Sequence, residues 1–129
     1  MERVTAPDGA RIAFERRGEG PPLLLVHGTA GDRHVWDGVI PALSERFTVY
    51  AVDRRGRGGS GDGEAYAVER EFEDIAAVAD AADGPVNLLG HSYGALCAVG
   101  AAPRLADLDR MVLYEPPLWT GGEGADRPR

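Results

Sequence analysis

The sequence predicts an α/β fold with a mostly parallel sheet, an N-terminal β-hairpin and helices on both faces of the sheet. Three observations predict this class. Short apolar runs alternate with segments that favour helix, which is the pattern of βαβ units. Turn residues separate two short strands at the start of the chain. Residues 86–102 combine a buried strand, a tight turn and a helix of small apolar residues.

The predicted hairpin opens the chain. Residues 3–6 and 11–17 have the length and composition of short strands. Pro7, Asp8 and Gly9 lie between them, and these residue types are typical of tight turns. The two strands are therefore expected to pair antiparallel.

The next segments alternate strand and helix. Residues 23–27 (LLLVH) form a continuous apolar run, as in a strand buried on both faces. A glycine-containing loop follows, and residues 35–43 predict a short helix that Pro41 bends or breaks. Residues 47–53 are rich in β-branched and aromatic types and predict another strand.

A longer helix is predicted over residues 68–82. Its apolar residues recur at helical spacing and share one face. The residues of that face are Val68, Phe72, Ile75 and Ala79. After the strand–turn–helix of residues 86–102, residues 111–114 (MVLY) predict a last strand beside it.

The turn after the strand at 86–89 carries the strongest chemical signal. Ser92 has Gly90 and Gly94 two positions away on either side. A strand that turns directly into a helix strains its central residue, and side chains at those two positions would collide. This spacing is that of a nucleophile elbow, which exposes the serine hydroxyl above the sheet. The alternative is an ordinary turn with a solvent-facing serine.

The loop after the first parallel strand offers a second part of such a site. Gly28 would let the loop fold over the serine, so that the Thr29 N–H and the Tyr93 N–H could bind a developing oxyanion. One such donor lowers the barrier of acyl transfer by about 3 kcal/mol. The alternative is an ordinary βα loop.

A glycine-rich loop at residues 54–63 contains the spacing Gly56-x-Gly58-x-x-Gly61, which matches a dinucleotide-binding pattern. That pattern should open a helix directly, whereas polar and small residues intervene here before residue 68. We therefore favour a structured loop in which Asp53 anchors nearby backbone N–H groups.

A serine nucleophile needs a base, usually histidine, oriented by a carboxylate. The chain has three histidines. His27 belongs to the oxyanion loop, His91 should point away from the serine hydroxyl, and nothing in its spacing selects His34. Glu115, just past the last strand, is a candidate acid by position alone.

These segments resemble the α/β-hydrolase superfamily in sequence and order, over residues 4–117. They are the hairpin, LLLVHGTAG, the segment at 36–43, FTVYAVDRRGRGGSGD, LLGHSYGA and MVLYEPP. The resemblance implies a nucleophile at Ser92 and an oxyanion hole at Thr29 and Tyr93. Family members are about twice as long and place a catalytic Asp and then a His on later strands. Residues 1–117 are thus expected to be the N-terminal part of such a domain, and 118–129 a loop or disordered tail.

Composition excludes several classes of protein. The chain has 129 residues, 43% of them hydrophobic, and a net charge of −7, which argues against nucleic-acid binding. Cys97 is the single cysteine, so no intrachain disulfide or cysteine metal cluster is expected. No apolar run is long enough to span a membrane, and the N-terminus has no apolar signal core. A cytoplasmic protein without metal or cofactor is expected.

The leading hypothesis is a serine hydrolase that acts on an ester or related acyl bond of a small molecule, incomplete for want of a catalytic His. An alternative is a non-catalytic half-domain that pairs with itself or a partner through the open sheet edge at residues 111–114. A third is a nucleotide-binding domain that uses the loop at residues 56–61.

Overall fold

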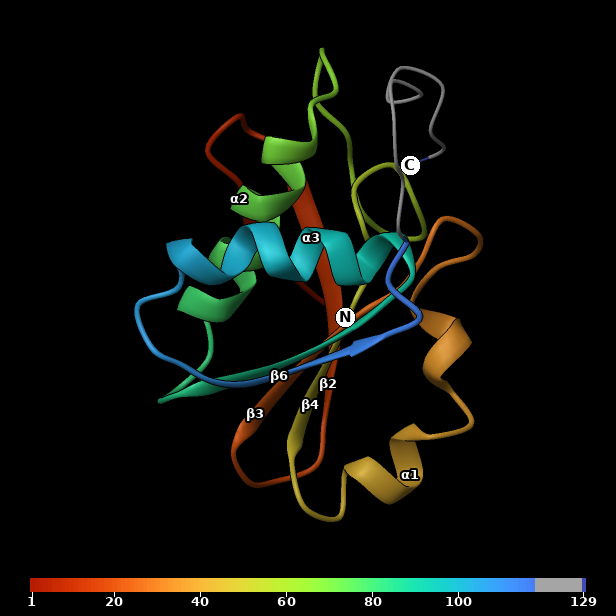
Figure 1. The fold of residues 1–129 in the computed structure, drawn as a ribbon, viewed down its shortest axis with the longest axis vertical. Coiled ribbons are helices and arrows are strands. Elements are labelled where there is room, and N and C mark those ends of the chain that lie inside the picture. The colour runs from red at the N-terminus through yellow and green to blue at the C-terminus, as the bar shows by residue number, and fades with distance from the viewer. Residues whose placement is uncertain (118–128) are drawn as a thin grey trace.

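A computed structural model describes residues 1–117 and residue 129. Its centre is a six-stranded sheet in the order β1-β2-β4-β3-β5-β6 (Figure 1). The strands are β1 (Glu2–Thr5), β2 (Arg11–Arg17), β3 (Pro22–Val26), β4 (Thr48–Val52), β5 (Val86–His91) and β6 (Leu108–Tyr114). The predicted fold class is therefore confirmed.

Two pairing modes share this sheet. β1 pairs antiparallel with β2, and β2 pairs antiparallel with β4. β3 lies parallel to both β4 and β5, and β5 lies parallel to β6. The hairpin is thus an antiparallel extension of a parallel sheet. Because β3 and β5 are parallel neighbours, their carboxyl ends meet at one edge, where the loops that follow them come together.

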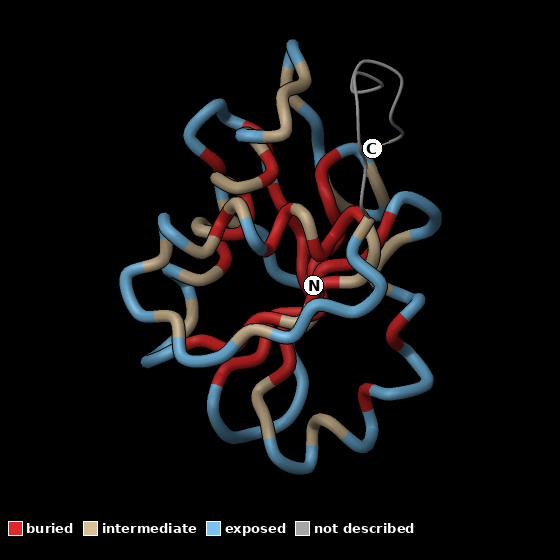
Figure 2. Tube along the Cα trace, viewed as in Figure 1, coloured by how far each residue is buried: buried red, intermediate tan, exposed pale blue. Residues whose placement is uncertain are grey.

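Helices cover both faces of the sheet. α2 (Val68–Asp80) and α3 (Tyr93–Ala101) lie over one face, and the 3-10 helix η1 (Arg33–Trp36) and α1 (Ile40–Leu43) contribute to the core on the other. Alternate residues of β3 serve the two cores: Leu24 and Val26 face α2 and α3, whereas Leu23 and Leu25 pack with Trp36 and Ile40. Figure 2 shows the buried residues gathered at the centre of the molecule, in β2 to β5, α2 and α3, whereas β6 is coloured as exposed or intermediate.

The predicted helix at residues 35–43 is wrong in form. The segment holds two short helices, η1 and α1, separated by residues 37–39. The Asp32 side chain caps η1 by accepting from the His34 N–H at 2.9 Å. Pro41 lies in the first turn of α1, where its missing N–H has no helical partner to lose. Pro41 therefore begins a helix, and does not break one.

The buried face of α2 also differs from the prediction. Its buried residues are Glu71, Asp74, Ile75 and Val78. Phe72 and the flanking apolar positions are only partly buried and pack at the margin of the core. Two carboxylates thus occupy the centre of a face expected to be apolar, because arginines from the loop after β4 pair with them.

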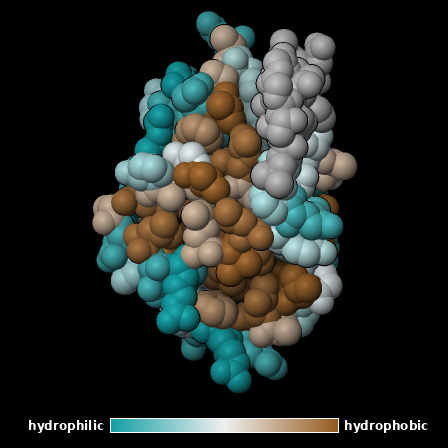
Figure 3. Space-filling view, viewed as in Figure 1, coloured by the Kyte–Doolittle hydropathy of each residue, from teal (hydrophilic) through white to brown (hydrophobic). Residues whose placement is uncertain are grey.

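β6 forms the far edge of the sheet within the described residues. Its hydrogen-bonded neighbour is β5, and its other edge faces outward. Val112 and Tyr114 are 58% and 57% exposed, and Leu113 is 37% exposed. Figure 3 shows apolar surface over α3 and β6. Within residues 1–117 no helix is long and apolar enough to cross a membrane. The tail predicted over residues 118–129 falls, except for residue 129, outside the described residues.

Candidate active site

Ser92 lies between the end of β5 and the first turn of α3 with a backbone conformation that is rare for a side-chain-bearing residue. Its φ is 55° and its ψ is −122°. The Ser92 N–H donates to the Tyr114 carbonyl at 3.0 Å, and the Ser92 carbonyl accepts from the Ala95 N–H at 2.9 Å. Such a conformation costs about 1–3 kcal/mol and persists where the surroundings fix it. The strand–turn–helix geometry of an elbow is therefore present.

The two glycines that flank Ser92 are required by close backbone packing. A Cβ on Gly90 would lie 2.6 Å from the Gly94 carbonyl oxygen. A Cβ on Gly94 would lie 2.2 Å from the Val26 carbonyl oxygen and 2.4 Å from that of His27. Because these neighbours are backbone atoms of fixed elements, any side chain at either position would push α3 off the sheet.

The loop after β3 lies against the serine. A Cβ on Gly28 would lie 3.1 Å from the Ser92 Cβ and 3.2 Å from the His91 carbonyl oxygen. Among the described residues, neither the Thr29 N–H nor the Tyr93 N–H donates to a hydrogen bond. Tyr93 opens a nine-residue helix, whose N-terminus carries a partial positive charge. Two N–H donors without partners therefore flank the serine.

His27 is a structural residue of this loop. Its side chain is completely buried, and burial lowers its pKa. Nε2 accepts the Arg54 backbone N–H at 3.1 Å, so the proton lies on Nδ1, which donates to the Gly28 carbonyl at 2.8 Å. Both ring nitrogens are therefore occupied by backbone groups, and His27 holds the loop in place.

His91 points to the face of the sheet opposite α3. Its Nε2 lies 3.1 Å from Glu115 Oε1, its ring stacks on Tyr114, and it meets Trp36 edge-on. The pair brings Glu115 to the carboxyl end of β6, beside the residue that precedes the serine. Glu115 has a φ of 50°, so its backbone turns sharply after the strand.

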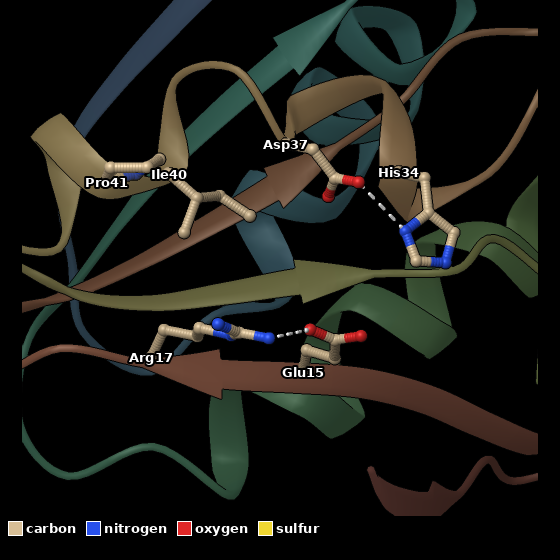
Figure 4. A pocket seen from close by; sticks show the side chains of 6 residues that line it. All are labelled: Glu15, Arg17, His34, Asp37, Ile40 and Pro41. Atoms are coloured by element: carbon tan, nitrogen blue, oxygen red, sulfur yellow. Dashed lines mark hydrogen bonds and ion pairs between the residues drawn. The ribbon is translucent and has the colours of Figure 1, made fainter.

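His34 takes part in a separate surface feature. Its Nδ1 lies 3.1 Å from Asp37 Oδ2, and both side chains are more than half exposed. They border a cavity of about 210 Å³ (Figure 4). The cavity is lined by Glu15, Arg17, His34, Asp37, Ile40 and Pro41. Ser92 is not among them, and in the described part of the chain no histidine is hydrogen-bonded to Ser92.

The glycine-rich loop after β4 is built around Asp53, which is fully buried. Its carboxylate accepts from the Arg33 N–H and the Gly59 N–H, each at 2.8 Å. A Cβ on Gly58 would lie 2.3 Å from that carboxylate. The glycines therefore allow the loop to wrap a carboxylate, and the expected anchoring by Asp53 is confirmed.

Sequence reasoning missed a buried charge network under the elbow. The Arg54 guanidinium donates to both Glu71 oxygens at 2.6 and 2.7 Å, and to the Gly28 carbonyl at 2.9 Å. It also lies over the Tyr93 ring, 4.7 Å from its centroid. The sequence held one signal for this pair: an arginine that follows a buried strand closely, and a glutamate in the first turn of the next helix, α2.

Two smaller expectations concern metal and thiol chemistry. Cys97 is buried in α3, and burial raises the pKa of its thiol, which suits a packing role. Within residues 1–117 and residue 129, no group of three or more His, Cys, Asp and Glu residues is placed to hold a metal ion.

Comparison with known proteins places this chain in a family. Residues 23–129 match the alpha/beta hydrolase family. The chain belongs to this family. A curated relative, 2-(acetamidomethylene)succinate hydrolase from Mesorhizobium japonicum, is 39% identical over 104 residues, which are 79% of this chain and 37% of the relative.

Solved structures extend the comparison. An alpha/beta hydrolase from Sphaerobacter thermophilus is 44% identical with a TM-score of 0.86, over 93% of this chain and 47% of that one. An N-formylmaleamic acid deformylase from Pseudomonas putida is 34% identical with a TM-score of 0.80, over 90% of this chain and 46% of that one. The chain spans less than half the length of each of these relatives.

Proposed function

We propose that this chain carries the nucleophile and the oxyanion hole of a serine hydrolase that acts on an ester or related acyl bond of a small molecule. One observation carries the proposal. Ser92 stands in an elbow with a φ of 55°, and the N–H groups of Thr29 and Tyr93 beside it have no hydrogen-bond acceptor among the described residues. The family membership and the hydrolase relatives support it.

In this proposal Ser92 Oγ attacks the acyl carbon while a base removes its proton. The carbonyl oxygen becomes an oxyanion and accepts hydrogen bonds from the Thr29 and Tyr93 N–H groups. The intermediate then expels the leaving group, which takes the proton from the protonated base, and water hydrolyses the acyl-enzyme. Each oxyanion donor contributes about 3 kcal/mol to lowering the barrier.

The base is not one of the histidines of this sequence. Both ring nitrogens of His27 are hydrogen-bonded to backbone groups, and His34 pairs with Asp37. His91 pairs with Glu115 on the face of the sheet opposite α3. We propose that a histidine outside this sequence supplies it, in the same polypeptide or in a second one. Glu115 remains the candidate acid by its position at the carboxyl end of β6, and its carboxylate would have to leave His91 to orient that base.

The test is covalent labelling with a fluorophosphonate, followed by intact mass and peptide mapping. Imidazole is added as a soluble base to replace the histidine. We expect a single adduct on Ser92 whose formation imidazole accelerates, no adduct in Ser92→Ala, and normal labelling in Ser44→Ala, a serine whose hydroxyl bonds to the Pro41 carbonyl. A wild-type chain that is not labelled with imidazole present, or labelling that survives Ser92→Ala, rules the proposal out.

A second candidate function is pairing through the β6 edge without catalysis. The observation that favours it is the exposed Val112, Leu113 and Tyr114 on a strand whose outer edge has no partner among the described residues. Sedimentation velocity should show association that rises with concentration. A monomer at all concentrations contradicts this function.

A further inference from the structure

The peptide group between Gly28 and Thr29 is clamped from one side. The Gly28 carbonyl accepts two hydrogen bonds, from Arg54 Nη1 at 2.9 Å and from His27 Nδ1 at 2.8 Å. The described chain has no cis peptide bond, so the N–H of this planar group points opposite to its carbonyl. Holding the carbonyl therefore fixes the direction of the Thr29 N–H, which points away from Arg54.

Arg54 also contacts the residue that carries the other donor. Its guanidinium lies over the Tyr93 ring at 4.7 Å from the centroid. The Tyr93 hydroxyl is hydrogen-bonded to the Tyr66 hydroxyl at 2.9 Å, which fixes the far end of the ring. One cation thus bonds the carbonyl of the Gly28–Thr29 peptide group and lies over the ring of Tyr93.

Arg54 is itself held rigidly. Its guanidinium forms a bidentate pair with Glu71 of α2, and both side chains are only 2% exposed. The Tyr66 hydroxyl donates to the same carboxylate. Burial opposes the charge on Arg54, but the hydrogen bonds and charge of Glu71 outweigh it and raise its pKa. Arg54 is therefore a fixed cation with one geometry.

We propose that Arg54, held by Glu71, is a positioning residue that aims the Thr29 and Tyr93 N–H groups at the oxyanion. The inference rests on the proposed function, because it assigns those N–H groups to the oxyanion hole. Hydrogen bonds weaken steeply when their angle falls below about 120°, so a modest rotation of either peptide group removes the donor's effect. The pair thus acts on the barrier through geometry, without contact with substrate.

The chain contains a matched control for this idea. Arg55, next to Arg54, forms an equivalent buried pair with Asp74 of α2 at 2.7 and 2.8 Å. Its other carboxylate partners are Asp8 in the hairpin turn, at 2.8 Å, and Asp62 in the loop after β4, at 4.0 Å. Like the Arg54–Glu71 pair, this pair is buried, oppositely charged and joins the loop after β4 to α2. Its further hydrogen bonds, however, are to the hairpin turn and not to the loop after β3.

The experiment compares two double variants, Arg54→Met with Glu71→Leu, and Arg55→Met with Asp74→Leu. Removing both members of a buried pair avoids stranding a charge and is often close to neutral for stability. Fluorophosphonate labelling of Ser92 is timed with saturating imidazole. We expect the first variant to react about 10- to 100-fold more slowly than wild type, which is less than the loss of about 10²–10³-fold when an oxyanion donor is removed outright, and the second to react as wild type does.

Two results overturn the inference: an unchanged rate in the first variant, or an equal loss in both, which would mean that any buried pair is needed. If the first variant lacks a folded far-ultraviolet circular dichroism spectrum, Glu71→Gln replaces it. This variant keeps a neutral acceptor for Arg54, and a slower rate is again expected. Equal rates for Glu71→Gln and wild type overturn the inference as well.

Nuclear magnetic resonance of protein that has not reacted with fluorophosphonate separates this inference from the proposed function. We expect the Gly28 carbonyl carbon and Thr29 amide resonances to shift in the Arg54 variant and to stay in place in the Arg55 variant. If wild type is not labelled at all, the proposed function fails while this measurement still tests the clamp. Unchanged resonances in the Arg54 variant overturn the clamp whatever the labelling shows.

Discussion

Substituting alanine for Gly94 tests the packing on which the elbow depends. The new Cβ would lie 2.2 Å from the Val26 carbonyl oxygen and 2.4 Å from that of His27, where ordinary contact is 3.4–4 Å. The shortfall at Val26 is 3.4 − 2.2 = 1.2 Å. Val26 is held in the sheet by β4 and β5 on either side, so α3 must give way.

Two effects of opposite sign set the magnitude. Alanine favours a helix over glycine by about 1 kcal/mol. Overpacking a well-packed site costs about 1–3 kcal/mol and more when the obstacle is backbone. We expect the clash to dominate, with a net loss of at least about 2 kcal/mol from a total stability of about 5–15 kcal/mol.

The assay is urea unfolding followed by circular dichroism, with two control variants. Gly38→Ala adds a Cβ that meets nothing within 4 Å, and should leave the free energy of unfolding unchanged. Gly100→Ala meets the Phe72 ring at 2.1 Å, and that side chain can swing aside, so an intermediate loss is expected. A Gly94→Ala protein as stable as Gly38→Ala would refute the packing argument.

Three further predictions follow from other residues. Ser92→Gly should stabilise the fold by about 1 kcal/mol, because glycine tolerates a φ of 55°; no gain over Ser92→Ala in urea unfolding would contradict this. The free energy of unfolding should fall as the pH drops from 6.5 to 5. In the unfolded chain His27 binds a proton in this range, whereas in the folded chain burial lowers its pKa and the ring stays neutral. The slope is at most about 1.4 kcal/mol per pH unit; His27→Gln should reduce it, and an unchanged slope in His27→Gln refutes the assignment. Val112→Lys should weaken self-association in sedimentation, since it places a charge on the exposed edge strand, whereas unchanged association would exclude that edge as the interface.

The parts of the fold that follow from local rules were predictable. The hairpin turn, the buried strands and the elbow each depend on residues close in sequence, and the structure confirms them. The glycines around Ser92 are an example: their spacing alone indicates close backbone approach, and the distances at Gly94 bear this out. The single helix predicted at residues 35–43 was wrong, because a proline can either interrupt a helix or begin one. Only the structure shows that Pro41 begins α1.

The contacts of buried charged residues were the main part of the structure that the sequence did not predict. On a helix, Glu71 and Asp74 are normally assigned to the solvent face, since burying a carboxylate is costly without a partner. Their partners, Arg54 and Arg55, lie in a loop about one strand–helix connection earlier, and only the tertiary fold brings each pair together. The same limit applies to the His91–Glu115 contact, which depends on β5 and β6 being parallel neighbours.

The topology separates the two tasks of the proposed reaction. β3 and β5 are parallel neighbours, so the loop after β3 meets the elbow after β5, and Gly28 lies against Ser92. The proposed nucleophile and the proposed oxyanion donors therefore belong to one strand pair and its loops, which Arg54 connects to α2. Proton transfer requires a side chain that this strand pair does not provide. It follows that a soluble base can replace the missing step but cannot replace a misdirected N–H, and imidazole should raise the labelling rate without closing the gap between wild type and the Arg54 variant.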